Sequence, residues 1–171
     1  CAWKVTGART LNQLARRWWG KGMIAAEYLA RRTGPMSMAP SQLGAFARSG
    51  PHVATPDLEW HVQPLSLEAF GQPLHDFPAI TASVCPLRPE SRGHVRITSP
   101  DPMQAPRIAP NYLSAPADRA TAARAIRLTR RIMRQEPLAR YRPEEFKPGA
   151  EWGDDSDEAL AEAAGRIGST I

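Results

Sequence analysis

The stretch SRGHVRITSPDPMQAPRIAPNYLS, residues 91–114, decides how the middle of this chain folds. Its segment HVRITS, 94–99, has the β-branched composition of a strand. Four prolines follow before residue 111. Because proline fixes φ and lacks an N–H, it favours stiff, extended connections over helix. We therefore expect two extended segments, joined by a rigid polar turn and leading directly into a helix.

The helix expected next runs from Ala117 to about Gln135. Apolar positions recur there with helical spacing, which predicts one buried stripe and one solvated face. The stripe comprises Ala122, Ile126, Thr129 and Met133. The solvated face carries Arg119, Arg124, Arg127, Arg130, Arg131 and Arg134. Together with the net charge of +5, these arginines leave open a basic module that binds nucleic acid or an acidic protein partner. Aromatic residues are not interleaved with the charges, so a base-stacking platform is not indicated.

Strand patterns stand earlier in the chain. Residues 57–66, DLEWHVQPLS, alternate with period two, so that Leu58, Trp60 and Val62 share one face. The opposite, polar face carries Glu59, His61 and Gln63. Two further strands are expected within 2–5 and 79–87, and Pro86 suits the end of the latter. Strands that follow one another without alternating helices predict an α+β fold, a largely antiparallel sheet covered on one face by helices.

Two more helices are expected at the ends of the chain. Residues 11–32 form one candidate, capped by Thr10 and weakened at Gly20 and Gly22, where we expect a kink or break. Trp18 and Trp19 within it are interpreted as packing residues. Residues 154–167, DDSDEALAEAAGRI, form the other, because Asp and Ser favour a helix N-terminus.

Composition narrows the class of protein. A chain of 171 residues is the size of one domain, and no apolar run reaches the roughly 18–20 residues that span a bilayer. No secretion leader is visible, and no cysteine–histidine spacing predicts a metal site. Cys1 and Cys85 are read as idle thiols in a reducing cytoplasm, although a bridge between them stays open. We therefore expect a cytoplasmic protein without a transmembrane segment.

An ordered set of segments carries a resemblance to a known family. The stretch 91–114, followed by Asp118 and the arginine-rich helix, is the longest. The other segments are VTGARTLN (5–12), GPMSMAPSQLGAFARS (34–49), PDLEWHV (56–62) and DDSDEALAEAAGRIGSTI (154–171). Together they resemble the C-terminal half of glucose-methanol-choline (GMC) flavoprotein oxidoreductases, in order and over essentially the whole chain.

The resemblance implies that 1–171 is a fragment forming the substrate-binding domain, whose sheet roofs the isoalloxazine ring of FAD. It also implies that 91–114 supplies two outer strands of that sheet. No GxGxxG turn occurs in the chain, so the bulk of the FAD site is expected in a separate FAD-binding domain of the same parent protein. The catalytic histidine of the family is expected just after Ile171. The fragment alone is therefore expected to be inactive.

The chemistry implied by the resemblance is oxidation of an alcohol CH–OH group, with hydride passing to flavin N5. A small-molecule alcohol is the expected substrate, and nucleic acid is not an expected partner. His61 matches a family position that faces substrate, and Ser41 matches a pocket-lining position. Gln42 and Gln63 are weaker candidates for substrate binding, and His75 and Phe77 are candidates for bordering access. A family branch that decarboxylates fatty acids in light has cysteine and arginine where Ser41 and His61 stand, so alcohol oxidation is favoured.

Overall fold

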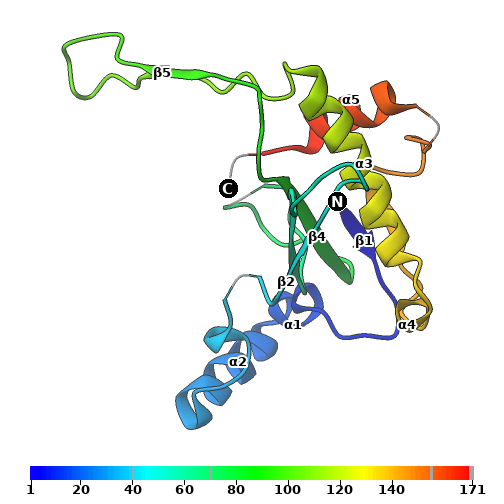
Figure 1. The fold of residues 1–171 in the computed structure, drawn as a ribbon. Coiled ribbons are helices and arrows are strands. Elements are labelled where there is room, and N and C mark those ends of the chain that lie inside the picture. Colours follow the sequence, from blue (N-terminus) through cyan, green and yellow to red (C-terminus); the bar gives the residue numbers. More distant parts are fainter. Residues whose placement is uncertain (40, 70, 155, 170–171) are drawn as a thin grey trace.

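The computed structural model describes residues 1–39, 41–69, 71–154 and 156–169. Within them, an antiparallel sheet has the strand order β2-β3-β4-β1-β7. Its strands are β1 (Ala2–Lys4), β2 (Leu43–Ala47), β3 (Leu58–Gln63), β4 (Ala79–Pro86) and β7 (Glu144–Lys147). Helices α3 (Pro116–Met133) and α5 (Asp157–Ile167) lie on one face (Figure 1). The short helices η1 (Pro35–Ser37) and α4 (Glu136–Ala139) lie in connections. The α+β class and the one-sided helical cover are confirmed.

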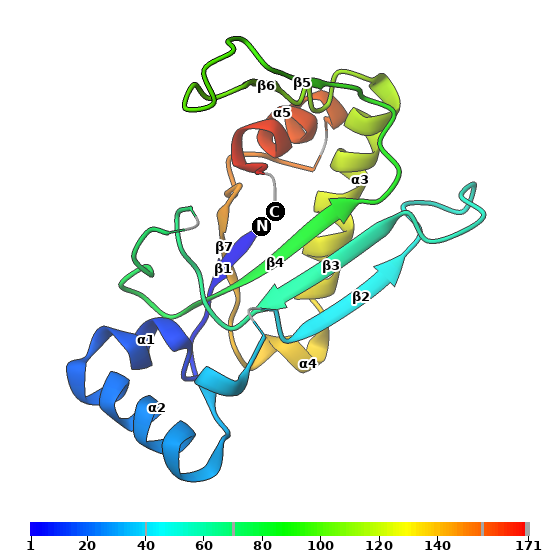
Figure 2. The ribbon, with the colours of Figure 1, turned by 90° about the vertical axis from the view of Figure 1, so that its left-hand side faces the viewer.

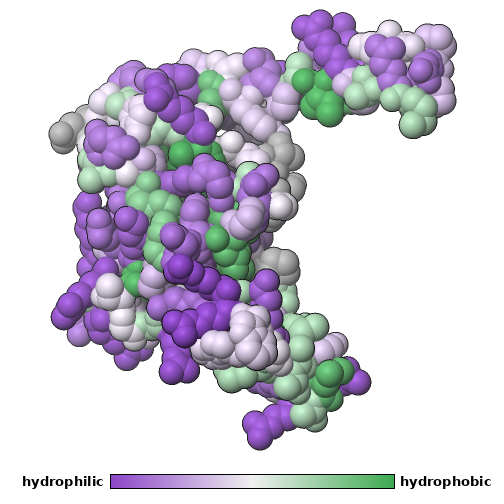
Figure 3. All heavy atoms as spheres, turned by 180° about the vertical axis from the view of Figure 1, so that it is seen from behind, coloured by the Kyte–Doolittle hydropathy of each residue, from purple (hydrophilic) through white to green (hydrophobic). Residues whose placement is uncertain are grey.

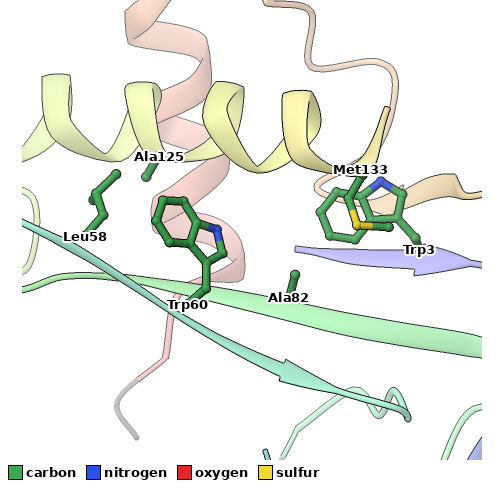
Figure 4. Close-up of a cluster of buried hydrophobic side chains, with 6 residues drawn as sticks. All are labelled: Trp3, Leu58, Trp60, Ala82, Ala125 and Met133. Carbon is green, nitrogen blue, oxygen red and sulfur yellow. The ribbon is translucent and has the colours of Figure 1, made fainter. Parts of the chain in front are cut away.

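The core forms where the apolar face of β3 meets α3. Leu58 and Trp60 are buried there beside Ala125 of the helix, as Figure 4 shows. Trp60 Nε1 donates to Thr129 Oγ1 at 2.9 Å, and that hydroxyl donates in turn to the Ala125 carbonyl at 2.7 Å. The period-two pattern of β3 therefore predicted its buried face correctly, and the indole is held by packing and by a hydrogen bond.

The helical stripe predicted for 117–135 is confirmed, because all four of its residues are buried. The predicted solvated face needs one correction, at Arg130, whose side chain is only 4% exposed. Its Nε lies 2.8 Å from Glu145 Oε2 and its Nη1 2.5 Å from Asp154 Oδ1. A buried guanidinium is retained because two carboxylates compensate for its lost hydration. Glu145 belongs to β7, a strand that the sequence did not reveal because it is only four residues long.

The helix expected over 11–32 is two helices, α1 (Leu11–Arg16) and α2 (Trp18–Arg31). The predicted break at Gly20 and Gly22 is wrong, since the break lies at Arg17, which is extended with φ −95° and ψ 137°. Gly20 serves a different purpose: a Cβ there would lie 2.0 Å from the Leu14 carbonyl oxygen. The glycine thus lets the start of α2 pack against the end of α1.

The expectation for 91–114 is half right. Strands β5 (His94–Arg96) and β6 (Arg107–Ala109) do form, but they pair with each other and are not outer strands of the main sheet. They make a hairpin that projects away from the body (Figure 1). Five of its six strand residues are exposed. Strands of only three residues present no buried face that would hold them to the main sheet. The prolines therefore stiffen a projecting hairpin and not an outer part of the sheet.

Asp118 ties the base of this hairpin to α3, and we expect it to make the fold sensitive to acid. Its carboxylate accepts hydrogen bonds from the backbone N–H groups of Glu90 and Ser91, each at 2.8 Å. Burial alone would raise the pKa of Asp118, but the Ser91 side chain and these two backbone hydrogen bonds hold it below the ordinary value of 3.8. Because the folded pKa is the lower one, the stabilisation is complete above about pH 3.8 and is lost as the pH falls below it.

Asp118→Asn should therefore reduce the free energy of unfolding at pH 7 by about 1–3 kcal/mol. The variant should also show a flatter loss of Tm below pH 4 than the parent, measured by thermal unfolding between pH 3 and 7. Asp101→Asn, on the exposed tip of the hairpin, is the matched control and should change neither quantity. An Asp118→Asn protein as stable as its parent at neutral pH would contradict this role.

Candidate functional site

The sheet face opposite α3 carries the polar side chains of β3. Residues Glu59, His61 and Gln63 alternate with the buried residues of the core face. Figure 2 looks onto this open face, with α3 behind the strands. His61 stands opposite Gly44 of β2 on one side and Ser83 of β4 on the other. Both cross-strand neighbours of the imidazole are therefore small residues.

His61 contacts one carboxylate on this face. Its Nε2 lies 3.3 Å from Glu59 Oε1, two residues earlier on the same strand. The side chains of His61 and Glu59 are 37% and 25% exposed. Because the Glu59 carboxylate lies beside Nε2, the other ring nitrogen, Nδ1, is the one that a ligand can contact. Nδ1 forms no hydrogen bond with any residue in the described part of the chain.

Ser41 and Gln63 are brought together at the other end of β3. Gln63 Nε2 donates to Ser41 Oγ at 3.4 Å, across the start of β2. Gln42 is exposed and its side-chain amide donates to the Ala39 carbonyl, although its backbone N–H donates to Val62 of β3. The structure thus puts His61 and Gln63 on one face, with Ser41 beside Gln63, whereas the side chain of Gln42 bonds to its own loop. Their roles in substrate binding stay predictions.

A buried polar network anchors the loop that walls this face, and sequence reasoning missed its central residue. Asn12 of α1 is 1% exposed. Its amide nitrogen donates to the carbonyls of Ser66 and His75, and its amide oxygen accepts from Ser66 N. His75 Nδ1 lies 2.9 Å from Ser66 Oγ, and the ring stacks on Phe77 at 5.1 Å between centroids. His75 and Phe77 therefore hold the loop in place. The sequence did not reveal the role of Asn12, because its partners Ser66 and His75 lie more than 50 residues away along the chain.

Two arms project from the body on the side of the open face. One is the β5–β6 hairpin and the other is α1 with α2 (Figure 1). Viewed from behind in Figure 3, both stand away to the same side, and both bear apolar patches. The exposed apolar side chains of the arms are Trp18, Trp19, Met23, Leu29, Val95, Ile97, Met103 and Ile108. Trp18 is 85% exposed, so its predicted packing role is wrong within this chain. Apolar area of this kind usually marks a surface that binds protein.

Other features of the described residues bear on the class of site. No helix among them has both the length and the apolar character needed to cross a bilayer. No cluster of three metal-ligating side chains occurs within the described ranges. Cys1 and Cys85 are free thiols, so the bridge left open by the sequence is not formed.

Comparison with known proteins places this geometry in a family. Residues 89–171 match the family model described as GMC oxidoreductase. The chain is 38% identical to an oxygen-dependent choline dehydrogenase of Escherichia coli over 148 residues. This aligned region is 86% of this chain and 26% of that protein. An oxygen-dependent choline dehydrogenase of Vibrio vulnificus is 35% identical over 140 residues, covering 82% of this chain and 25% of that protein.

The fold is shared with a solved structure of formate oxidase from Aspergillus oryzae RIB40. The TM-score is 0.81 at 21% identity, over 97% of this chain and 33% of that chain. At this identity the likeness concerns the fold alone. The chain spans about a quarter of the length of the curated relatives. The family match and the relatives show that this chain belongs to the GMC oxidoreductase family and corresponds to its C-terminal region.

Proposed function

We propose that residues 1–171 form the substrate-binding domain of an FAD-dependent oxidoreductase that oxidises the CH–OH group of an alcohol. The observation that carries this proposal is the open polar face of the sheet, centred on His61. A sheet face that bears His61, Glu59 and Gln63 and is covered by no described helix suits a ligand. The apolar arms on the same side suit a protein partner, and we assign them to the flavin-binding domain of the same protein.

The described residues fit FAD only as one wall of its site. The open face offers hydrogen-bonding groups above a planar ring, but the chain offers no phosphate turn. The nearest approach is GKGMIA at 20–25, which lies inside α2 and not in a turn between a strand and a helix. FAD, when bound, would supply the electron acceptor for the alcohol carbon. Its phosphates would be held by the flavin-binding domain.

His61 is assigned the binding and orientation of the alcohol oxygen. Because Glu59 lies at Nε2, the free nitrogen Nδ1 is placed to contact the substrate hydroxyl. The adjacent carboxylate also disfavours an anionic substrate, since like charges at this distance repel. A neutral alcohol therefore suits this face better than a fatty acid does. Gln63, steadied by Ser41, is assigned a second polar contact to the substrate.

The general base is proposed to come from outside the described residues. The position expected for it, just after Ile171, lies beyond them. We accordingly propose that the domain binds substrate but is inactive without the flavin-binding domain. The cytoplasmic location expected from the two thiols stays a prediction.

The decisive test is flavin reduction in the full-length protein. The purified protein should be yellow, and adding a primary alcohol without oxygen should bleach its absorbance near 450 nm, roughly where oxidised flavins absorb. The corresponding carboxylate, at the same concentration, is the control and should leave the spectrum unchanged. A colourless protein, or one bleached equally by the carboxylate, would contradict the proposal.

A further inference from the structure

A groove distinct from the open face runs between α3 and the connection from β2 to β3. It has a volume of about 610 Å³. Arginine dominates its lining. The residues that define this arginine groove are Arg48, Pro51, Arg124, Arg127, Leu128 and Arg131. Leu128 lies one turn from Arg124 and from Arg131, so α3 presents an apolar residue between two cations.

The β2–β3 connection is held firmly as the second wall of the groove. Ser49 donates both its backbone N–H and its hydroxyl to the Asp57 carboxylate, each at 2.6 Å. The backbone N–H of Asp57 in turn donates to the Ala47 carbonyl. Burial alone would raise the pKa of Asp57, but the hydrogen bonds from Ser49 hold it below its ordinary value. The Asp57 carboxylate thus stays charged at neutral pH. Its hydrogen bonds to Ser49 close the loop between β2 and β3, and this closure fixes the backbone next to Arg48.

The arginines of α3 differ in whether they have an acidic partner. Arg127 pairs with Asp157, and Arg130 pairs with Asp154, as does Arg134 just beyond the end of the helix. Of these three arginines, only Arg127 also lines the groove. The other three groove arginines, Arg48, Arg124 and Arg131, form no salt bridge with any carboxylate among the described residues. Arg124 Nε is in addition buried without a hydrogen-bond partner there. Arg124 nevertheless interacts electrostatically with the nearby Asp57 carboxylate and helps to lower the pKa of Asp57. Arginines that line a hollow without a salt-bridge partner favour an anionic ligand.

We propose that the arginine groove binds an acidic peptide segment of a partner protein. The chain itself shows the chemistry, because Asp154 and Asp157 already bind arginines of the same helix through carboxylate–guanidinium pairs. Such pairs are directional and suit side-chain carboxylates. The groove, with its volume of about 610 Å³, has room for more than a single small anion, and Leu128 with Pro51 would contact an apolar residue between the acidic ones. Nucleic acid fits less well, since no aromatic residue lines the groove for stacking.

This proposal is independent of the flavin chemistry and is tested separately. The probe is a fluorescein-labelled peptide with alternating glutamate and leucine, titrated into the full-length protein and followed by fluorescence anisotropy. The double variant Arg48→Gln/Arg131→Gln should weaken binding about tenfold or more, since it removes two of the three unpaired cations. Both residues are exposed, so the fold should be retained, as thermal unfolding would verify.

The matched control is Arg119→Gln, an exposed arginine of α3 that does not line the groove. It should change the dissociation constant less than about twofold, because exposed charges outside the site are screened. A peptide with glutamine for every glutamate should not bind. Equal weakening by Arg119→Gln, absence of peptide binding, or tighter binding of a single-stranded DNA of equal charge would each overturn the proposal.

Discussion

Replacing His61 with alanine in the full-length protein is expected to lower kcat/KM for the alcohol about 10²- to 10³-fold, the usual cost of removing one well-placed hydrogen-bonding group. The reason lies in its position, central on the open face between Gly44 and Ser83. Steady-state kinetics with a primary alcohol measure the loss. Flavin content and Tm should stay nearly unchanged, because the imidazole is 37% exposed and lies outside the buried core.

His52→Ala provides the matched control, since it removes the same group from an exposed position in the β2–β3 connection. Its kinetics should equal those of the parent. A His61→Ala protein with unaltered kcat/KM would remove His61 from the site. If kcat/KM and flavin content fell together, His61 would be a structural residue and not a substrate contact.

Trp60→Ala is expected to produce the largest loss of stability, about 3–5 kcal/mol, because it leaves a cavity beneath α3. The indole is 2% exposed and packs between the sheet and the helix (Figure 4). Its removal also deprives Thr129 Oγ1 of a donor. Chemical denaturation, followed by circular dichroism, measures the change.

Trp60→Phe separates these two contributions. It retains most of the ring volume but loses the hydrogen bond to Thr129, so a smaller loss of about 1–2 kcal/mol is expected. Equal losses in the two variants would show that the hydrogen bond, and not the packing, stabilises this core. A Trp60→Ala protein within about 1 kcal/mol of its parent would contradict the core described above.

Several elements could be predicted from local sequence. The alternation in 57–66 placed His61 and Gln63 on one face and Trp60 on the other. The spacing of Ala122, Ile126, Thr129 and Met133 predicted α3 with its buried stripe. These predictions succeeded because the spacing of apolar residues along a helix or strand directly indicates which of its faces is buried. The ordered motifs added the family, which periodicity does not contain.

The failures share a physical cause, which is contact between residues far apart in sequence. The path of 91–114 depended on which strand each segment would pair with, and a three-residue strand carries too little pattern to choose. Likewise Arg130 reads as one more surface arginine until Glu145 and Asp154 are brought beside it. The break at Arg17 depended on how closely α2 packs on α1, which only Gly20 against Leu14 reveals.

The candidate site divides in the same way. Alternation placed His61 and Gln63 on the polar face of the strand, and the resemblance to the family made His61 the first candidate for substrate binding. The contacts of Glu59 with the imidazole and of Asn12 with Ser66 and His75 came only with the tertiary structure. The amino-acid sequence thus determined which side chains face away from the core, because hydrophobic burial acts along each element separately. Tertiary structure alone decided which of those side chains meet, because hydrogen bonds and ion pairs depend on distances that the order of residues does not encode.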